Sequence, residues 1–151
     1  MRASNLTSVL GLGACVFVAA AVAAFFALGP VARAHQPRTI HAIDGDTLED
    51  PATRVTYRLA NIDTPEVGRN ARCSAERALG ERATRRVRTL LANAERIETR
   101  STGRIDSYGR DVAYVLVDGR DLGDALVREG LARPWRGRRE PCCDSTGRLI
   151  P

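Results

Sequence analysis

The sequence contains no lysine, only two histidines, and no C-x-x-C pair among its four cysteines. Without Cys and His at metal-ligand spacing, a structural zinc site is disfavoured. No internal repeat is visible, and a chain with 44% hydrophobic and 27% charged residues is neither disordered nor fibrous. The length of 151 residues suits one domain. All 23 basic residues are therefore arginines, and with 18 acidic residues they give a net charge of +5.

The N-terminal part carries the one long apolar run. Residues 9–28 contain no charged side chain, and as a helix they would reach across the hydrocarbon core of a bilayer. Ala32-Arg33-Ala34 follows as a small-x-small cleavage site, which favours a signal peptide, whereas the length of the run favours an uncleaved anchor that associates with a membrane. We therefore expect residues 1–34 to be a leader or an anchor. Either would place the protein outside the cytoplasm, secreted, periplasmic or anchored to the outer side of a membrane.

Three cysteines remain beyond this segment. In an oxidising compartment Cys73 is expected to form a disulfide with Cys142 or Cys143, which leaves one thiol unpaired. The sequence alone does not choose between the two partners. We divide the rest of the chain into a domain over residues 35–140 and a short C-terminal tail over 141–151 that holds the cysteine pair.

Short β-like stretches and two helical patterns follow the leader. The expected strands lie within residues 38–62, 96–99 and 111–117, where apolar residues alternate or cluster between turn signals. The expected helices cover residues 74–93, with Ser74 as the N-terminal cap, and residues 121–129. Five short strands with two helices favour a small β-barrel over a parallel sheet, which would need more crossover helices.

Four carboxylates lie in two turn-like stretches that each follow a strand, and they are Asp44, Asp46, Asp63 and Glu66. If these strands are neighbours in a barrel, the acids converge at one rim and repel one another unless a cation neutralises them. Oxygen ligands favour Ca²⁺ or Mg²⁺. Pro65 keeps Thr64 extended, so that the Thr64 carbonyl is available as a further ligand. The alternative is that Asp-Gly and Asp-Thr-Pro are only turn formers.

Two arginines favour the functional interpretation. Arg58 is expected to precede Asp63 on the same strand, and Arg110 follows the turn Asp106-Ser107-Tyr108-Gly109. Acids that hold a cation beside planar, bidentate guanidinium donors are what a phosphodiester substrate needs. The cation and both guanidiniums would neutralise the charge that develops in the transition state.

Four ordered motifs carry a family resemblance: Ile43-Asp44-Gly45-Asp46-Thr47, Tyr57-Arg58-Leu59 with Ile62-Asp63-Thr64-Pro65-Glu66, Asp106 to Arg110, and Ala125 to Ala132. In this order and spacing the sequence resembles the staphylococcal nuclease-like (thermonuclease) family. The resemblance implies an OB-fold, a five-stranded β-barrel with two packed helices. It also implies a Ca²⁺-dependent nuclease, a hydrolase that cuts phosphodiester bonds of DNA and RNA and leaves 3′-phosphate ends.

The resemblance also implies roles for single residues. Asp46, Asp63 and the Thr64 carbonyl would bind Ca²⁺, with Asp44 behind them. Glu66 would act through water as the general base. The two guanidiniums, those of Arg58 and Arg110, would hold the phosphate, and Tyr108 would lie beside the bound nucleotide. The protein is expected to act as a monomer.

The chain departs from the family's pattern near its C-terminus. The long C-terminal helix of the type enzyme is missing, and its base-contacting tyrosines have no clear equivalents. Trp135 is a candidate to stack on a base, and a place at the rim or in the core is the alternative. A non-catalytic OB-fold module that binds nucleic acid is the competing function. The acids favour the enzyme, since a mere binder does not need groups that repel its ligand.

Overall fold

The computed structural model describes residues 39–150. The expected leader or anchor over residues 1–34, with the apolar run 9–28, lies outside this range. Among the described residues, no helix has both the length and the apolar character needed to cross a membrane.

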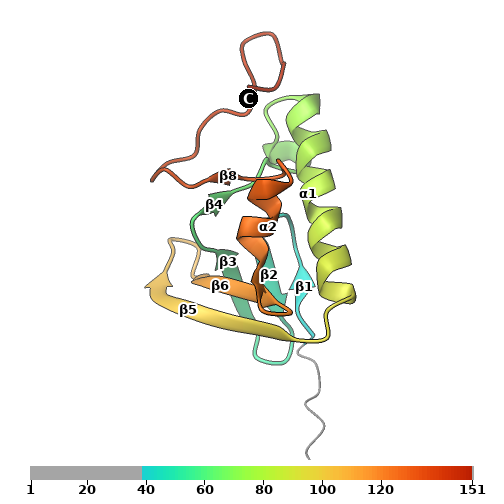
Figure 1. Cartoon of the computed structure of the whole chain (residues 1–151). Helices are drawn as coiled ribbons and strands as arrows, with labels where there is room; N and C mark the ends of the chain where they lie inside the picture. Colours follow the sequence, from blue (N-terminus) through green and yellow to red (C-terminus); the bar gives the residue numbers. More distant parts are fainter. Residues whose placement is uncertain (1–38, 151) are drawn as a thin grey trace, which may run out of the picture. The chain divides into compact units, whose positions relative to one another are not determined.

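One curled sheet forms the body of the domain (Figure 1). Its strands follow the spatial order β1 (His41–Ala42), β2 (Thr47–Asp50), β3 (Val55–Leu59), β6 (Asp111–Val117) and β5 (Ile97–Ile105). All of these neighbours are antiparallel except β3 and β6, which run parallel. The short β7 (Arg120–Asp121) pairs with β6. A separate two-stranded sheet joins β4 (Ile62–Asp63) to β8 (Arg133–Pro134). With its two helices this is the OB-fold that the sequence predicts.

The first helix, α1 (Ser74–Ala92), follows a short 3-10 turn, η1 (Gly68–Asn70). Its N-terminal cap is Cys73, whose Sγ accepts a hydrogen bond from the Glu76 amide at 3.3 Å, so the prediction of Ser74 as the cap was wrong by one residue. Asn93 ends the helix as predicted. The second helix, α2 (Leu122–Arg128), is capped by the Asp121 carboxylate, which accepts from the Asp124 amide at 2.8 Å.

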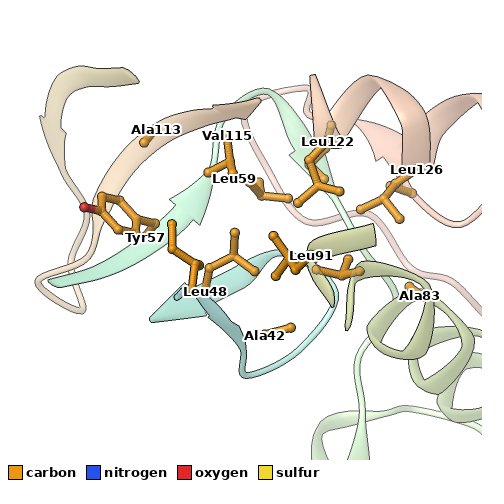
Figure 2. Close-up of a cluster of buried hydrophobic side chains, with 14 of the residues drawn as sticks. Ala42, Leu48, Tyr57, Leu59, Ala83, Leu91, Ala113, Val115, Leu122 and Leu126 are labelled. Atoms are coloured by element: carbon orange, nitrogen blue, oxygen red, sulfur yellow. The ribbon is translucent and has the colours of Figure 1, made fainter. Parts of the chain in front are cut away.

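The buried core joins the inner face of the sheet to both helices. The fully buried side chains include Leu48 of β2, Val87 of α1, Val115 of β6 and Leu126 of α2. Figure 2 shows these layers meeting, with leucines of α2 against those of the sheet. Burying one such aliphatic side chain contributes roughly 1.5–3 kcal/mol. The core therefore holds the strands whose ends carry the predicted site residues.

Two strands differ in how well the sequence predicted them. β6 covers the predicted residues 111–117. β5 runs on to Ile105, six residues beyond the predicted end at Thr99, because it pairs with β6 up to Ser101 and again at Arg104 and Ile105. A register shift between Ser101 and Arg104 interrupts this pairing. Exposed polar residues such as Arg100 and Ser101 hid this extension, since the outer half of β5 has no apolar face.

The C-terminal tail contains no helix within the described residues up to 150. Of the two possible partners for Cys73, the structure bonds Cys143, across 70 residues of sequence. Cys142 is a free, buried thiol. Burial, more than the nearby charges, raises the pKa of the Cys142 thiol to about 11. The disulfide therefore ties the tail to the N-terminus of α1.

Gly80 sets how closely α1 approaches the loop that follows β4. A Cβ atom at this position would lie 2.5 Å from the Pro65 carbonyl oxygen and 2.6 Å from that of Glu66. Both atoms belong to the backbone, so neither can rotate away as a flexible side chain would. The glycine therefore lets α1 lie directly against the segment that carries Glu66.

We expect the substitution Gly80→Ala to destabilise the protein by about 1–3 kcal/mol, because the added methyl group overpacks the contact. Elsewhere in a helix interior the same change stabilises by about 1 kcal/mol. Urea unfolding of both Gly80→Ala and Ala78→Gly measures the difference, since Ala78 is an exposed residue of the same helix. A stabilised Gly80→Ala variant would show that α1 does not set the position of this loop.

Candidate active site

Asp46 joins the two acidic loops. It lies between β1 and β2, and its Oδ2 atom accepts hydrogen bonds from the Thr64 amide at 3.2 Å and the Thr64 hydroxyl at 3.0 Å. Both residues are buried, with 4% of each exposed. The same oxygen lies 3.2 Å from Arg58 Nη2. One buried carboxylate therefore fixes the start of β2, the end of β4 and an arginine of β3.

Asp44 shapes the first loop from within. Its Oδ1 atom accepts from the amides of Asp46 at 3.0 Å and Thr47 at 2.8 Å, which is the hydrogen-bond pattern of an Asx turn. Gly45 lets the first loop approach the second closely, because a Cβ at this position would lie 2.9 Å from the Thr64 hydroxyl oxygen. Burial and the negative charge of Asp46 raise the pKa of Asp44. Asp44 therefore aims Asp46 at the second loop and adds negative charge behind it.

Arg58 lies between the acids of the two loops. It belongs to β3, whereas Asp63 belongs to β4, so the prediction of one strand for both was wrong. Its Nη2 atom is 3.6 Å from Asp63 Oδ1, in addition to its contact with Asp46, and also donates to the Ile62 carbonyl at 2.9 Å. Nη1 donates to the Leu59 carbonyl at 2.7 Å. Burial raises the pKa of Asp63, and the charge of Asp46 adds to this, while Arg139 and Arg58 oppose it. The two arginines therefore offset only part of the cost of burying the Asp63 carboxylate.

Arg110 approaches the same centre from the turn before β6. Its Nε atom pairs with Asp106 Oδ2 at 2.7 Å, and Nη1 donates to the Thr47 hydroxyl at 3.0 Å. Within residues 39–150, Arg110 Nη2 has no hydrogen-bond partner. The ring of the exposed Tyr108 lies 5.0 Å from the guanidinium carbon. Arg110 is thus oriented on two sides while one nitrogen stays available to a ligand.

These groups surround one open cavity of about 510 Å³. Seven of the eight residues predicted for catalysis, metal or substrate binding line this cavity: Asp44, Asp46, Arg58, Thr64, Glu66, Tyr108 and Arg110. The eighth, Asp63, is buried beside it and pairs with Arg58. The two loops that the sequence places apart therefore face the same space. The disulfide cysteines, Cys73 and Cys143, do not line the cavity.

A second, smaller hollow of about 220 Å³ continues from this cavity. Tyr108 and Trp135 line both spaces, and the Trp135 ring is 39% exposed. The Trp135 amide donates to the Asn61 carbonyl at 2.8 Å, and the guanidinium carbon of Arg58 lies 6.0 Å from its ring. Trp135 therefore lies at the rim of the cavity and not in the core, and stacking on a base stays a prediction.

Sequence reasoning missed three residues that shape the site. Glu76 is buried and accepts from the amides of Arg72 at 2.7 Å and Glu66 at 3.3 Å, so it anchors the loop before α1. Its position three residues after the helix cap was the one available signal. Asp106 orients Arg110. Arg139 pairs with both Asp63 and Glu66, and nothing distinguished it from the other arginines of the tail.

Oxygen atoms at the junction of the two loops are the candidate ligands for a metal ion. Within residues 39–150 there is no group of three or more His, Cys, Asp or Glu side chains arranged to hold one. The donors at the loop junction are instead two buried carboxylates, Asp46 and Asp63, and the backbone of Thr64. Hard oxygen donors with mutual repulsion fit Ca²⁺ or Mg²⁺, both of which complete their coordination with water. The donors at this junction are therefore of the kind that suits a hard divalent cation.

Comparison with known proteins agrees with the family resemblance of the sequence motifs. A family model described as "Staphylococcal nuclease homologue" matches residues 56–148. Endonuclease YncB of Bacillus subtilis (strain 168) is 38% identical over 95 residues, which cover 61% of this chain and 44% of that protein. The SPbeta prophage-derived endonuclease YokF of the same organism is 38% identical over 100 residues, 61% of this chain and 31% of that protein. The match spans less than half the length of either relative.

The Asp106–Arg110 pair gives a pH-dependent prediction. Burial acts to raise the pKa of Asp106, but hydrogen bonds from the Arg110 amide and guanidinium and the Tyr108 amide outweigh it and lower the pKa. Its charged form therefore stabilises the folded protein above its unfolded pKa, and this contribution is lost as the pH falls through the folded pKa.

We expect Asp106→Asn to destabilise the protein most at neutral pH, with the difference from the parent shrinking as the pH approaches 2. Urea unfolding across this range measures it. Glu95→Gln is the matched control, since Glu95 is an exposed carboxylate that makes no ion pair with the described residues. A difference for Asp106→Asn that does not depend on pH would contradict the assignment.

Proposed function

The chain belongs to the staphylococcal nuclease homologue family, and we propose that it is a Ca²⁺-dependent nuclease that hydrolyses phosphodiester bonds of DNA and RNA and leaves 3′-phosphate ends. The convergence of Asp46, Glu66, Arg58 and Arg110 on one open cavity carries the proposal. Acids and planar cations around one solvent-filled space suit a negatively charged ester and its attacking water. The printed names of the two relatives, both endonucleases, support the same class of activity.

Ca²⁺ would be held by Asp46, Asp63 and the carbonyl oxygen of Thr64. When bound, it supplies a Lewis acid that polarises a phosphoryl oxygen of the substrate. The protein's part is to hold the two loops together. The hydrogen bonds from Thr64 to Asp46 do this, and the Asx turn at Asp44 fixes the direction of the Asp46 side chain. Neither loop can then move without breaking a buried hydrogen bond.

The two guanidiniums would bind the scissile phosphate. Arg110 is oriented by Asp106 and Thr47 and lines the cavity, and its Nη2 makes no hydrogen bond with the described residues. Arg58 lies between the acids and neutralises part of their repulsion toward an anionic substrate. A planar fork matches two phosphate oxygens at once, and preorganised donors need no rearrangement as charge develops in the transition state.

Glu66 would orient or deprotonate the attacking water. Its side chain is 27% exposed and lines the cavity, so it can reach a water molecule beside the phosphate. The Glu66 amide is held by the buried Glu76, which fixes the backbone that carries the catalytic carboxylate. In-line attack would expel the 5′-linked oxygen, with Arg110 beside that oxygen.

Tyr108 and Trp135 would contact the nucleotide on either side of the phosphate. Both rings are exposed and line the hollow that continues from the cavity. Aromatic stacking on bases contributes roughly 1–3 kcal/mol per base and does not depend strongly on sequence. This arrangement suits a nuclease with little base preference.

The disulfide supports a place of action outside the cytoplasm. Disulfides persist in oxidising compartments and are rare where thiols are kept reduced. Together with the apolar run 9–28, this supports a secreted, periplasmic or membrane-anchored nuclease that acts as a monomer.

The test of the proposal is a digestion assay of the full chain with DNA and with RNA, in Ca²⁺ or in excess chelator, beside a Glu66→Gln variant. We expect cleavage of both substrates in Ca²⁺, 3′-phosphate ends, and loss of cleavage with chelator or in the variant. Retention of nucleic acid without cleavage in any divalent cation would instead support a non-catalytic OB-fold binding module.

The substitution Arg110→Lys keeps the charge and removes the fork. We expect the cleavage rate to fall by about 10²–10³, the effect of deleting one preorganised donor. Single-turnover kinetics measure it, with Arg82→Lys as the control, because Arg82 is an exposed residue of α1 outside the cavity. Equal rates for the two variants would exclude Arg110 from the reaction.

A further inference from the structure

Arg139 makes direct ion pairs with two acids of the proposed cation site. Its Nη2 atom lies 2.9 Å from Asp63 Oδ1, and Nη1 pairs with Glu66 Oε1. The Asp63 side chain is only 6% exposed, so the guanidinium reaches a carboxylate that has little other access to solvent. Arg139 therefore occupies the acids that would bind the cation and activate water.

The tail holds Arg139 in this place by attachments on both sides. Before it, β8 pairs with β4, so that Arg133 lies opposite Asp63. Arg133 then reaches along the tail, and its guanidinium donates to the carbonyls of Glu140 at 3.1 Å and Pro141 at 3.2 Å. After it, Cys143 is bonded to Cys73 at the start of α1. The segment with Arg139 is thus tied down on both sides, and Arg139 itself lines the cavity.

Arg139 and a divalent cation compete for the same charge. A carboxylate oxygen that accepts a hydrogen bond from a guanidinium at 2.9 Å has one lone pair fewer to offer a metal ion. Both partners are positive, so their repulsion opposes simultaneous binding. Arg58 already provides one positive group between Asp46 and Asp63. A second one in the tail makes the acids least available to a cation while Arg139 is in place.

We propose that Arg139 is a built-in competitor of the divalent cation, and that the disulfide-closed tail sets how much of the time it occupies the acids. The inference rests on the cation site of the proposed function. Arg139 must leave Asp63 and Glu66 before the cation binds, so only the fraction of molecules in which it has left is competent. Removing the guanidinium makes every molecule competent and raises the apparent affinity by the inverse of that fraction.

Calorimetric titration of the full chain with Ca²⁺, without nucleic acid, tests the competition. We expect Arg139→Gln to bind Ca²⁺ about tenfold more tightly than the parent, as for a site that is competent about a tenth of the time. Arg138→Gln is the matched control. Arg138 is an exposed neighbour that makes no ion pair with the described residues, and its substitution removes the same charge. Equal shifts for both variants, or weaker binding by Arg139→Gln, would overturn the proposal.

The tether has its own variant. Cys73→Ser removes the disulfide and replaces the sulfur that caps α1 with a hydroxyl oxygen that can cap it. We expect it to bind Ca²⁺ more tightly than the parent, and we expect no further gain when Arg139→Gln is added. Thermal unfolding confirms that the variant is folded during the titration. If Cys73→Ser binds Ca²⁺ with the same affinity as the parent, the disulfide does not set how often Arg139 occupies the acids.

A third variant separates this inference from the proposed function. Asp46→Asn removes a cation ligand and leaves Arg139 unchanged. If Asp46→Asn abolishes Ca²⁺ binding while Arg139→Gln leaves it as in the control, competition by Arg139 is wrong and the cation site stands. If Asp46→Asn binds Ca²⁺ like the parent, the cation site itself is wrong, and the competition falls with it.

Discussion

The site depends on one buried carboxylate. Asp46 accepts two hydrogen bonds from Thr64 and forms an ion pair with Arg58, and these contacts join the start of β2, β3 and the end of β4, which belongs to the smaller sheet. A buried charge of this kind is costly unless every partner is present. If one partner is removed, a buried charge is left uncompensated and the contacts that hold the loops together are weakened. The cavity, the proposed cation site and the position of Arg58 all follow from this single junction.

Residues farther from Asp46 also hold the two acidic loops in place. The Asx turn at Asp44 orients the first loop, Gly80 lets α1 lie against the second, and the buried Glu76 holds the Glu66 amide. The disulfide then ties the tail to the same end of α1. The turn, the helix contact and the disulfide together restrict the two loops. This restriction is how a domain with a modest core can hold charged groups close together.

Local signals in the sequence predicted more than distant ones. The apolar period of α1, its end at Asn93 and the strand at residues 111–117 follow from neighbouring residues, and the structure confirms them. The motif order brought the acids and arginines into one set of candidates, and all of them except Asp63 line one cavity. The outer half of β5 was missed because its order comes from pairing with β6 rather than from its own polar sequence. Arg139 was missed because its partners, Asp63 and Glu66, lie more than 70 residues away and its neighbours are also arginines. The choice of Cys143 over Cys142 depends in the same way on how the tail folds.

The central claim is that two loops meet over a divalent cation with two guanidiniums facing a phosphate. A crystal structure of the full chain with Ca²⁺ and a nucleoside 3′,5′-bisphosphate tests it most directly. The account predicts a cation with oxygens of Asp46, Asp63 and the Thr64 carbonyl at about 2.3–2.6 Å, and a phosphate in contact with Arg58 and Arg110. A cation bound elsewhere, or a phosphate that avoids both arginines while the loops keep their places, would contradict it.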